Sequence, residues 1–343
     1  MNQKVLIIGP SFFGYNQSFQ QSFQQLGYDT QILSFDEPIH PFTIKNAILH
    51  KLFPKNQTMQ DKSRTRFNRE VMQVHAQFKP DLVFIYNGDI LNIDTIRLLK
   101  QQSRVAIWML DGAFLHPRSI ALAPYVDAYF CFEKSDVELL LKAGVPAYFL
   151  PQGYDPAVYF PMEQTKDIDI LFVGTLYRYP ERIRLLKRVV DELGSKYSIK
   201  IYGRYKPLFK NPLQWLTREH RATFMNKNIA PQKVNQLYNR AKVCINIHHD
   251  QTQEGANPKV FEICGAGTFQ VVDYNPYIAS VYKQEEVAFY HSDQELIDSI
   301  RTILENQHYT KAIEAQQIVS SEHTFTDRIR QALHIIEQAQ KAV

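Results

Sequence analysis

Cysteine is scarce in this chain, and long apolar runs are missing. The 343 residues contain 3 cysteines, Cys131, Cys244 and Cys264, which lie far apart and each within an apolar run. This pattern excludes a disulfide framework and a cysteine-based metal site, and it predicts buried reduced thiols. No apolar run approaches the length of a bilayer span, and the opening apolar run breaks at a Gly-Pro step too early for a signal peptide. We therefore expect a cytoplasmic protein.

A strong overall charge of either sign is also missing, since the formal net charge is +4. Charged residues make up 22% and hydrophobic residues 45%, ordinary values that exclude a disordered or fibrous class. Two stretches are nevertheless basic: residues 178–227 contain 13 Lys or Arg against 4 Asp or Glu, and residues 40–70 contain 7 against 2. They are either solvated helix faces or surfaces for anionic ligands. Neither carries a recognisable nucleic-acid-binding module, so no nucleic acid is expected as a partner.

The chain repeats one folding plan. Residues 4–35 predict a strand, a helix closed by Gly27 and a second strand, and residues 168–203 repeat that order. Further strands are continuously apolar, which is typical of parallel sheets covered on both faces. They are expected at about residues 81–86, 104–110, 127–132, 147–150, 242–248, 268–272 and 287–291. The sequence therefore predicts an α/β protein with two Rossmann-like, doubly wound domains, which the length of the chain also favours.

Composition suggests where the domains begin and end. The stretch QGYDPAVYFPMEQTK is rich in Pro and polar residues, has no long period, and is predicted to be the linker between domains. We therefore expect an N-terminal domain of residues 1–160 and a C-terminal domain of residues 161–320. By analogy with proteins of this plan, residues 321–343 are expected to pack back on the N-terminal domain.

The stretch QEGANPKVFEICGAGTFQVV predicts a helix start with a binding site. Pro258 suits the first helical position because it has no N–H, and Asn257 is a favourable N-cap. The free N–H groups there, with Lys259 on the first turn, form an anion site suited to a diphosphate. Glu262, expected beside Lys259 on the exposed face, would lie about 6 Å further along the axis, where it suits ribose hydroxyls. A solvated i, i+3 salt bridge between Lys259 and Glu262 is the alternative.

The same stretch resembles a known family. Glu254 and Glu262 are separated by seven residues and followed by Gly-Ala-Gly, which is similar to the E-x7-E signature of GT-B glycosyltransferases. The order of this stretch, the segment VAFYHSDQELIDSI and a terminal HTFTDRI resembles the CgeB-like (spore-maturation type) glycosyltransferases over residues 168–330. The resemblance implies the GT-B fold, with two Rossmann-like domains facing a cleft and C-terminal helices returning to the first domain.

The resemblance also implies a role for individual residues. Glu254 would act on the transferred sugar as a catalytic residue, Lys259 would bind the diphosphate and Glu262 the ribose. The other donor-binding residues expected are Gly174, Arg178, Arg204 and Asn257. Gly174 lies where backbone can approach a phosphate, whereas the two arginines are alternatively part of the basic surface.

The N-terminal domain is expected to bind the acceptor. Its opening turn lacks the G-x-G-x-x-G spacing, which argues against a dinucleotide. Asp111 and His116 follow a buried strand, where they can supply a general base or orient an acceptor hydroxyl. Alternatively, Asp111 caps a turn and His116 is solvated. The basic residues 40–70 mix lysines with apolar residues, and they either pack into the core or rest on an anionic membrane surface.

These observations lead to one expected function. We expect a glycosyltransferase that moves a sugar from a nucleoside diphosphate sugar to a hydroxyl of a glycan or lipid-linked acceptor, in cell-surface polysaccharide or glycoconjugate synthesis. No DxD-like metal site is evident, so positive groups are expected to stabilise the leaving diphosphate without a metal or other cofactor. The E-x7-E pattern implies retention of configuration. The alternatives are a nucleotide-sugar 2-epimerase and a non-catalytic nucleotide-sugar-binding protein.

Overall fold

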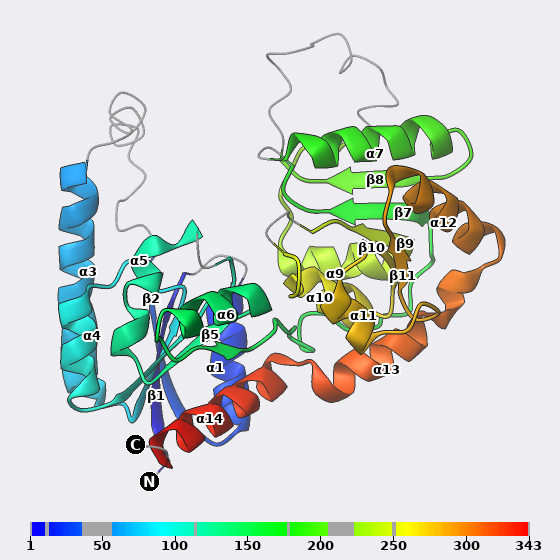
Figure 1. Cartoon of the computed structure of the whole chain (residues 1–343). Coiled ribbons are helices and arrows are strands. Elements are labelled where there is room, and N and C mark those ends of the chain that lie inside the picture. The colour runs from blue at the N-terminus through cyan, green and yellow to red at the C-terminus, as the bar shows by residue number, and fades with distance from the viewer. Residues whose placement is uncertain are drawn as a thin grey trace. The chain divides into compact units, whose positions relative to one another are not determined.

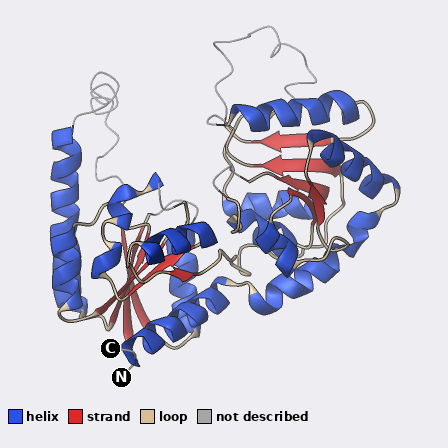
Figure 2. Cartoon of the chain, viewed as in Figure 1, coloured by secondary structure: helices blue, strands red, loops and turns tan. Residues whose placement is uncertain are grey.

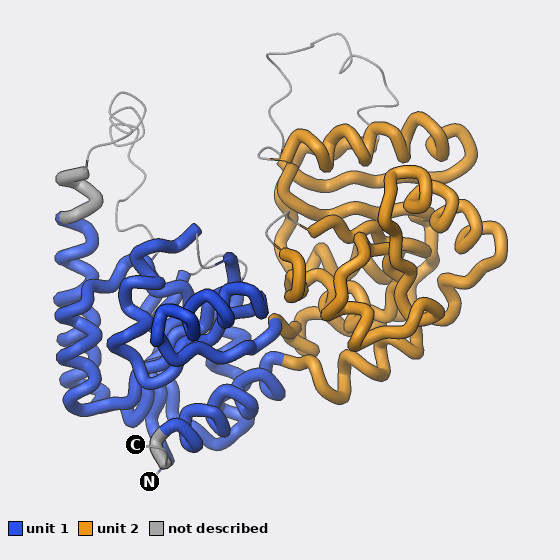
Figure 3. Tube along the Cα trace, in the orientation of Figure 1, with its two compact units in different colours: residues 1–151, 325–343 blue, residues 152–324 orange. Residues whose placement is uncertain are grey.

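The computed structural model divides the chain into two compact units, coloured blue and orange in Figure 3. Unit 1 comprises residues 1–151 and 325–343, and unit 2 comprises residues 152–324. The sequence placed the first boundary after residue 160, whereas the structure places it after Pro151. The structure describes residues 2–10, 14–35, 57–112, 115–176, 179–204, 223–248 and 252–341. Side chains are described for these residues except 57–61 and 340–341.

Unit 1 is built on a parallel sheet. In its described part the strand order is β2-β1-β3-β4-β5-β6 (Figure 1). The strands are β1 (Lys4–Gly9), β2 (Asp29–Ser34), β3 (Leu82–Tyr86), β4 (Arg104–Trp108), β5 (Ala128–Cys131) and β6 (Tyr148–Phe149). Within β1, Leu6 and Ile8 enter one apolar cluster, and Val5 and Ile7 enter another. Both faces of the sheet are therefore covered, which explains the continuous apolarity of the strands.

Helices cover both faces of the unit 1 sheet (Figure 2). One face carries α3 (Gln57–Phe78), α4 (Ile93–Lys100) and α6 (Lys134–Lys142), and the other carries α1 (Tyr15–Gln25) and α14 (Phe325–Lys341). The apolar stripe of α14, at helical spacing, is Phe325, Ile329, Ala332 and Ile336. The rings of Phe325 and Phe19 pack edge to face, 5.0 Å between centroids. The last helix of the chain thus belongs to unit 1.

Unit 2 has a second parallel sheet, with the order β11-β10-β9-β7-β8 in its described part. The strands are β7 (Ile168–Val173), β8 (Ile199–Tyr202), β9 (Ala241–Asn246), β10 (Phe269–Asp273) and β11 (Ala288–Tyr290). The chain leaves β7 toward β8 on one side and returns to β9 on the other. The order therefore reverses between β7 and β9, and open α/β sheets bind ligands at the carboxyl ends of the strands at such a point.

The helices of unit 2 also form two layers. On one face α7 (Pro180–Leu193) and α12 (Asp293–Glu305) share an apolar cluster with β7 and β9. On the other face lie α9 (Pro231–Arg240), α10 (Pro258–Gly265) and α13 (Ala312–Glu322), with α10 packed against α13 and β10. Two short helices, α5 (Pro117–Ile120) in unit 1 and α11 (Pro276–Val281) in unit 2, follow strand ends. The α/β class and the two doubly wound sheets predicted from the sequence are confirmed.

The stretch predicted to be the linker is packed into unit 2. Tyr154 and Tyr159 are buried, and Tyr154 forms a parallel bridge with Thr324. The backbone N–H of Phe160 donates to Asn235 Oδ1 of α9 at 3.2 Å. Buried aromatic side chains and backbone hydrogen bonds thus hold this Pro-containing stretch on unit 2.

The structure also bears on the expectations for the cysteines and for long apolar helices. Cys131, Cys244 and Cys264 are buried free thiols, as predicted, and burial raises the pKa of each. In the described part of the chain, no helix is both long enough and apolar enough to cross a bilayer.

Candidate functional site

Helix α10 starts at the carboxyl ends of β9 and β10. Asn257 is its N-cap: the side-chain Oδ1 accepts the N–H of Val260 at 3.3 Å, and Pro258 follows at the first helical position. The helix start predicted from the Asn-Pro step is therefore confirmed. Asn257 also bonds to Asn246 at the end of β9, with Nδ2 donating to Oδ1 at 3.1 Å. The cap thus ties the helix start to the neighbouring strand.

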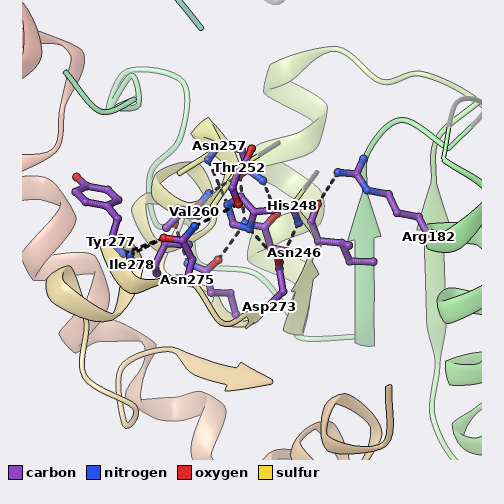
Figure 4. A network of polar contacts seen from close by, with 12 residues as sticks. Arg182, Asn246, His248, Thr252, Asn257, Val260, Asp273, Asn275, Tyr277 and Ile278 are labelled. Carbon is purple, nitrogen blue, oxygen red and sulfur yellow. Dashed lines mark hydrogen bonds and ion pairs between the residues drawn. The ribbon is translucent and has the colours of Figure 1, made fainter. Parts of the chain in front are cut away.

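A histidine joins the same helix start to β10 (Figure 4). His248 Nδ1 lies 2.9 Å from Asp273 Oδ1, and the backbone N–H of His248 donates to that oxygen, also at 2.9 Å. A carboxylate only accepts, so Nδ1 carries the proton and Nε2 is left as an acceptor. Nε2 accepts the backbone N–H of Asn257 at 3.3 Å. A strand end, a histidine and the helix cap therefore form one hydrogen-bonded chain.

This chain of bonds changes the anion site expected from the sequence. Of the amides at the helix start, that of Asn257 donates to His248 and that of Val260 donates to the capping side chain. Pro258 has no N–H. The backbone N–H of Lys259 therefore remains for an anion, together with the ammonium group of the same residue. In the described part of this helix start, the anion site thus has fewer free amides than the sequence suggested, and Lys259 supplies both the N–H and the ammonium group.

Glu262 is buried, not exposed as the sequence suggested. Its side chain is 4% exposed, against 34% for Lys259, and the two charged groups lie 3.9 Å apart. The expectation was wrong because α10 is covered on nearly all sides: Val260, Phe261 and Ile263 are buried as well. Tyr159 is hydrogen-bonded to Glu262, and burial first and then this carboxylate raise the pKa of the Tyr159 hydroxyl. A buried carboxylate needs such partners, and here they fix its position.

The other predicted donor residues differ in their exposure and in their position in unit 2. Glu254 is half-buried in the loop before α10, Arg204 is exposed just beyond β8, and Arg178 lies outside the described residues. Gly174, at the end of β7, donates its N–H to Tyr202 O at 2.9 Å. A Cβ at the neighbouring Gly203 would lie 1.9 Å from Gly174 O, so the ends of β7 and β8 require this close packing.

Arg182 is a residue that sequence reasoning missed. It is buried on helix α7, and its guanidinium donates to Thr175 O at 3.2 Å and to Ile247 O at 2.6 Å. It also lies over the ring of Tyr179, 4.6 Å from the centroid. Arg182 therefore links the ends of β7 and β9, between which the strand order reverses. The sequence placed it in a basic stretch with other helical arginines, and nothing there distinguishes it from them.

Unit 1 brings a second cluster together. His116, just before α5, contacts the carboxylate of Asp89 through Nδ1 and lies 3.5 Å from Asp111 Oδ2 through Nε2. The carboxylates of Asp111 and Asp89 raise the pKa of His116 to about 9, although burial opposes them. The predicted pair Asp111 and His116 is therefore brought together. Asp89 was missed, although its place three residues beyond β3 was a signal available in the sequence.

The described residues contain no group of three or more His, Cys, Asp and Glu side chains that could hold a metal ion. Asp89 and Asp111 lie on opposite nitrogens of the same ring, an arrangement that separates their carboxylates. Within helix α10 itself, the charged groups are those of Lys259 and Glu262.

Residues 178–334 match the family model described as "Glycosyl transferase-like". No curated protein gave a significant match. Among solved structures, sucrose-phosphate synthase from Thermosynechococcus elongatus has a TM-score of 0.69 at 14% identity, with 100% of each chain covered. Anabaena HepE in complex with UDP and glucose has a TM-score of 0.64 at 12% identity, covering 98% of this chain and 100% of that one.

The chain has the GT-B fold. A third structure of similar fold is α,α-trehalose 6-phosphate synthase from Burkholderia multivorans, with a TM-score of 0.65 at 10% identity, covering 100% of this chain and 98% of that one. The family match begins at α7 and includes α10, so the start of α10 lies inside the part of this GT-B chain that is similar to glycosyltransferases in sequence. Fold and family match together support a glycosyltransferase.

Proposed function

We propose that this GT-B protein transfers a sugar from a nucleoside diphosphate sugar to a hydroxyl group of a glycan or lipid-linked acceptor. The observation that carries the proposal is the start of helix α10. There the N–H and ammonium groups of Lys259 lie at the carboxyl edge of the unit 2 sheet, next to a fixed carboxylate. This edge is where doubly wound sheets bind their ligands. The complex of Anabaena HepE with UDP and glucose supports a uridine nucleotide as the first donor to test.

Each group at this edge then has a part in donor binding. The diphosphate binds the N–H and the ammonium group of Lys259. Since the Lys259 side chain is 34% exposed and 3.9 Å from Glu262, it can turn toward the phosphates. Ribose hydroxyls then take its place on the Glu262 carboxylate. Glu254 contacts the transferred sugar, and Gly174, Arg178, Arg204 and Asn257 complete the donor site.

The leaving diphosphate gains negative charge as the glycosidic bond breaks. A lysine and a helix start that meet this charge stabilise the transition state more than the ground state. We propose that they do so without a metal ion. The E-x7-E spacing of Glu254 and Glu262 supports retention of configuration and a place among CgeB-like enzymes. Residues 40–70, most of which lie outside the described part, would bring the protein to an anionic membrane surface.

A thermal-shift panel of nucleoside diphosphates and their sugars tests the proposal, beginning with UDP and UDP-glucose. A ligand at 100 times its dissociation constant stabilises the folded protein by about 2.7 kcal/mol. We expect one diphosphate series to raise the melting temperature of the wild type, and both Lys259→Ala and Glu262→Ala to weaken the shift. A folded protein that no nucleotide stabilises would contradict the proposal. Transfer is then assayed as release of the nucleoside diphosphate that depends on an added acceptor.

A further inference from the structure

The cluster in unit 1 holds a histidine between two carboxylates. Asp89 contacts Nδ1 of His116, and Asp111 lies 3.5 Å from Nε2. Ionised carboxylates only accept hydrogen bonds, so a proton on each ring nitrogen is stabilised by the carboxylate beside it. A ring with both nitrogens protonated is an imidazolium, which cannot accept another proton. The general-base role that the sequence suggested for His116 therefore conflicts with its surroundings.

The two carboxylates of the cluster differ in their hydrogen bonds and in their exposure to solvent. Asp89 uses both oxygens, because Oδ2 contacts His116 and Oδ1 accepts the backbone N–H of Ser119 at 3.1 Å. Ser119 is itself buried and held, since its hydroxyl accepts from Tyr129 at 3.2 Å. Asp111 is the more exposed partner: its side chain is 52% exposed, against 35% for Asp89. Asp89 is thus anchored to the fold, while Asp111 can meet a ligand.

We propose that Asp89 is a positioning residue of the transfer reaction: it holds His116 as an imidazolium, whose Nε2–H orients the carboxylate of Asp111 as the base for the acceptor. The inference rests on the proposed function. In the reaction, the acceptor oxygen forms a bond to C1 of the donor sugar, on the face from which the diphosphate leaves, while the bond from C1 to the diphosphate breaks. The diphosphate leaves with the electron pair, and the hydroxyl proton passes to a carboxylate oxygen of Asp111. His116 keeps its protons throughout.

The charged and titratable groups around His116 determine the pH at which its imidazolium loses a proton. Among the described residues, the ionisable groups that face it are Asp89 from the loop after β3 and Asp111 from the loop after β4. Tyr129 of β5 reaches the cluster through Ser119, and burial raises the pKa of its hydroxyl, so it stays neutral. Arg118, the neighbouring cation on α5, is exposed. The two carboxylates thus dominate, and they raise the pKa of His116 from 6.5 to about 9.

NMR titration of the full-length protein tests the cluster without any activity. The Cε1–H signal of His116, assigned by its loss in His116→Gln, should titrate near pH 9 in the wild type. It should titrate at lower pH in Asp89→Asn, because one of the two carboxylates is gone. Asp94→Asn is the matched control, since Asp94 is exposed on α4 and pairs with Arg97; it should leave the titration unchanged. Titration of the wild-type His116 near 6.5 would overturn the inference.

Kinetics test the role in transfer. We expect Asp89→Asn to lower kcat by roughly 10- to 100-fold, less than the 10²- to 10⁴-fold typical of losing a base in Asp111→Asn. The KM for the donor should stay unchanged, and the fall in rate above about pH 9 should begin at lower pH in Asp89→Asn. An unchanged kcat and pH profile in Asp89→Asn would refute the positioning role. A wild type without transfer would refute the proposed function instead, while the titration still decides whether Asp89 holds His116 protonated.

Discussion

His248 Nδ1 lies 2.9 Å from Asp273 Oδ1, and through this contact the end of β10 supports the start of helix α10. The carboxylate also accepts the backbone N–H of His248, and the other ring nitrogen accepts the N–H of Asn257. The geometry of the proposed diphosphate site thus depends on residues that do not touch the diphosphate themselves.

Asp273→Ala should weaken both the fold and the donor site. It leaves the N–H groups of His248, whose side chain is 1% exposed, without their acceptor, at a cost of about 1–3 kcal/mol in unfolding free energy. The affinity for a nucleoside diphosphate should fall as well, because the α10 start loses its support. Asp169→Ala is the control: Asp169 also accepts a backbone N–H and pairs with a lysine, but at the start of β7. Equal loss of affinity in both variants would mean that the effect is one of stability alone.

Asn257→Ala removes a helix cap at the proposed site. Loss of an N-cap costs about 0.5–2 kcal/mol, and here Asn246 also loses one of its partners. We expect a lower unfolding free energy in urea and weaker binding of the nucleoside diphosphate. Ser292→Ala removes the cap of α12, where Ser292 Oγ accepts the N–H of Glu295 at 3.3 Å, and should reduce stability only. Binding that survives in Asn257→Ala would separate the cap from the donor site.

Lys259→Gln tests the charge that meets the diphosphate. A hydrogen bond to a charged group contributes about 1.5–3 kcal/mol, so the dissociation constant should rise roughly 10- to 100-fold. Isothermal titration calorimetry with UDP and UDP-glucose, below the melting temperature of the variant, measures this change. The control Lys233→Gln alters an exposed lysine of α9 and should bind as the wild type does. If the two variants bind equally well, Lys259 is not the phosphate ligand.

Tyr159→Phe removes the hydroxyl that supports Glu262. The buried carboxylate then lacks one partner, and we expect a loss of about 1–3 kcal/mol in unfolding free energy. Tyr238→Phe is a sensitive control because its ring lies 6.1 Å from that of Tyr159 and its hydroxyl has no hydrogen-bond partner among the described residues. That variant should cost little or be neutral. A larger loss in Tyr238→Phe than in Tyr159→Phe would contradict the support assigned to Glu262.

The sequence predicted the elements well because each carries a local signal. Continuous apolar runs marked the strands, and the Asn-Pro step marked the start of α10. Contacts across the fold carry no such signal. Arg182 and Ile247 meet because β7 and β9 are neighbours in the sheet, and no spacing along the chain shows it. Glu262 lies on a helix that is covered on nearly all sides, and its partner Tyr159 comes about a hundred positions earlier in the chain.

Polar residues at the carboxyl ends of parallel strands are a sequence signal for some of the contacts that were not predicted. Parallel strands end at one edge of a sheet, so polar residues at several strand ends are expected to meet there. His248 and Asp273 follow or end neighbouring strands in unit 2, and Asp89 and Asp111 follow neighbouring strands in unit 1. This signal predicts proximity but not the hydrogen bonds, because those depend on loop conformations and side-chain rotamers.

Hydrogen–deuterium exchange with and without saturating UDP tests the central claim most directly. The account predicts slower exchange in peptides that cover residues 252–265, where α10 begins, and unchanged exchange in α12, whose start is capped in a similar way. Protection confined to other parts of the chain, with UDP bound, would contradict the claim that the start of α10 holds the donor diphosphate.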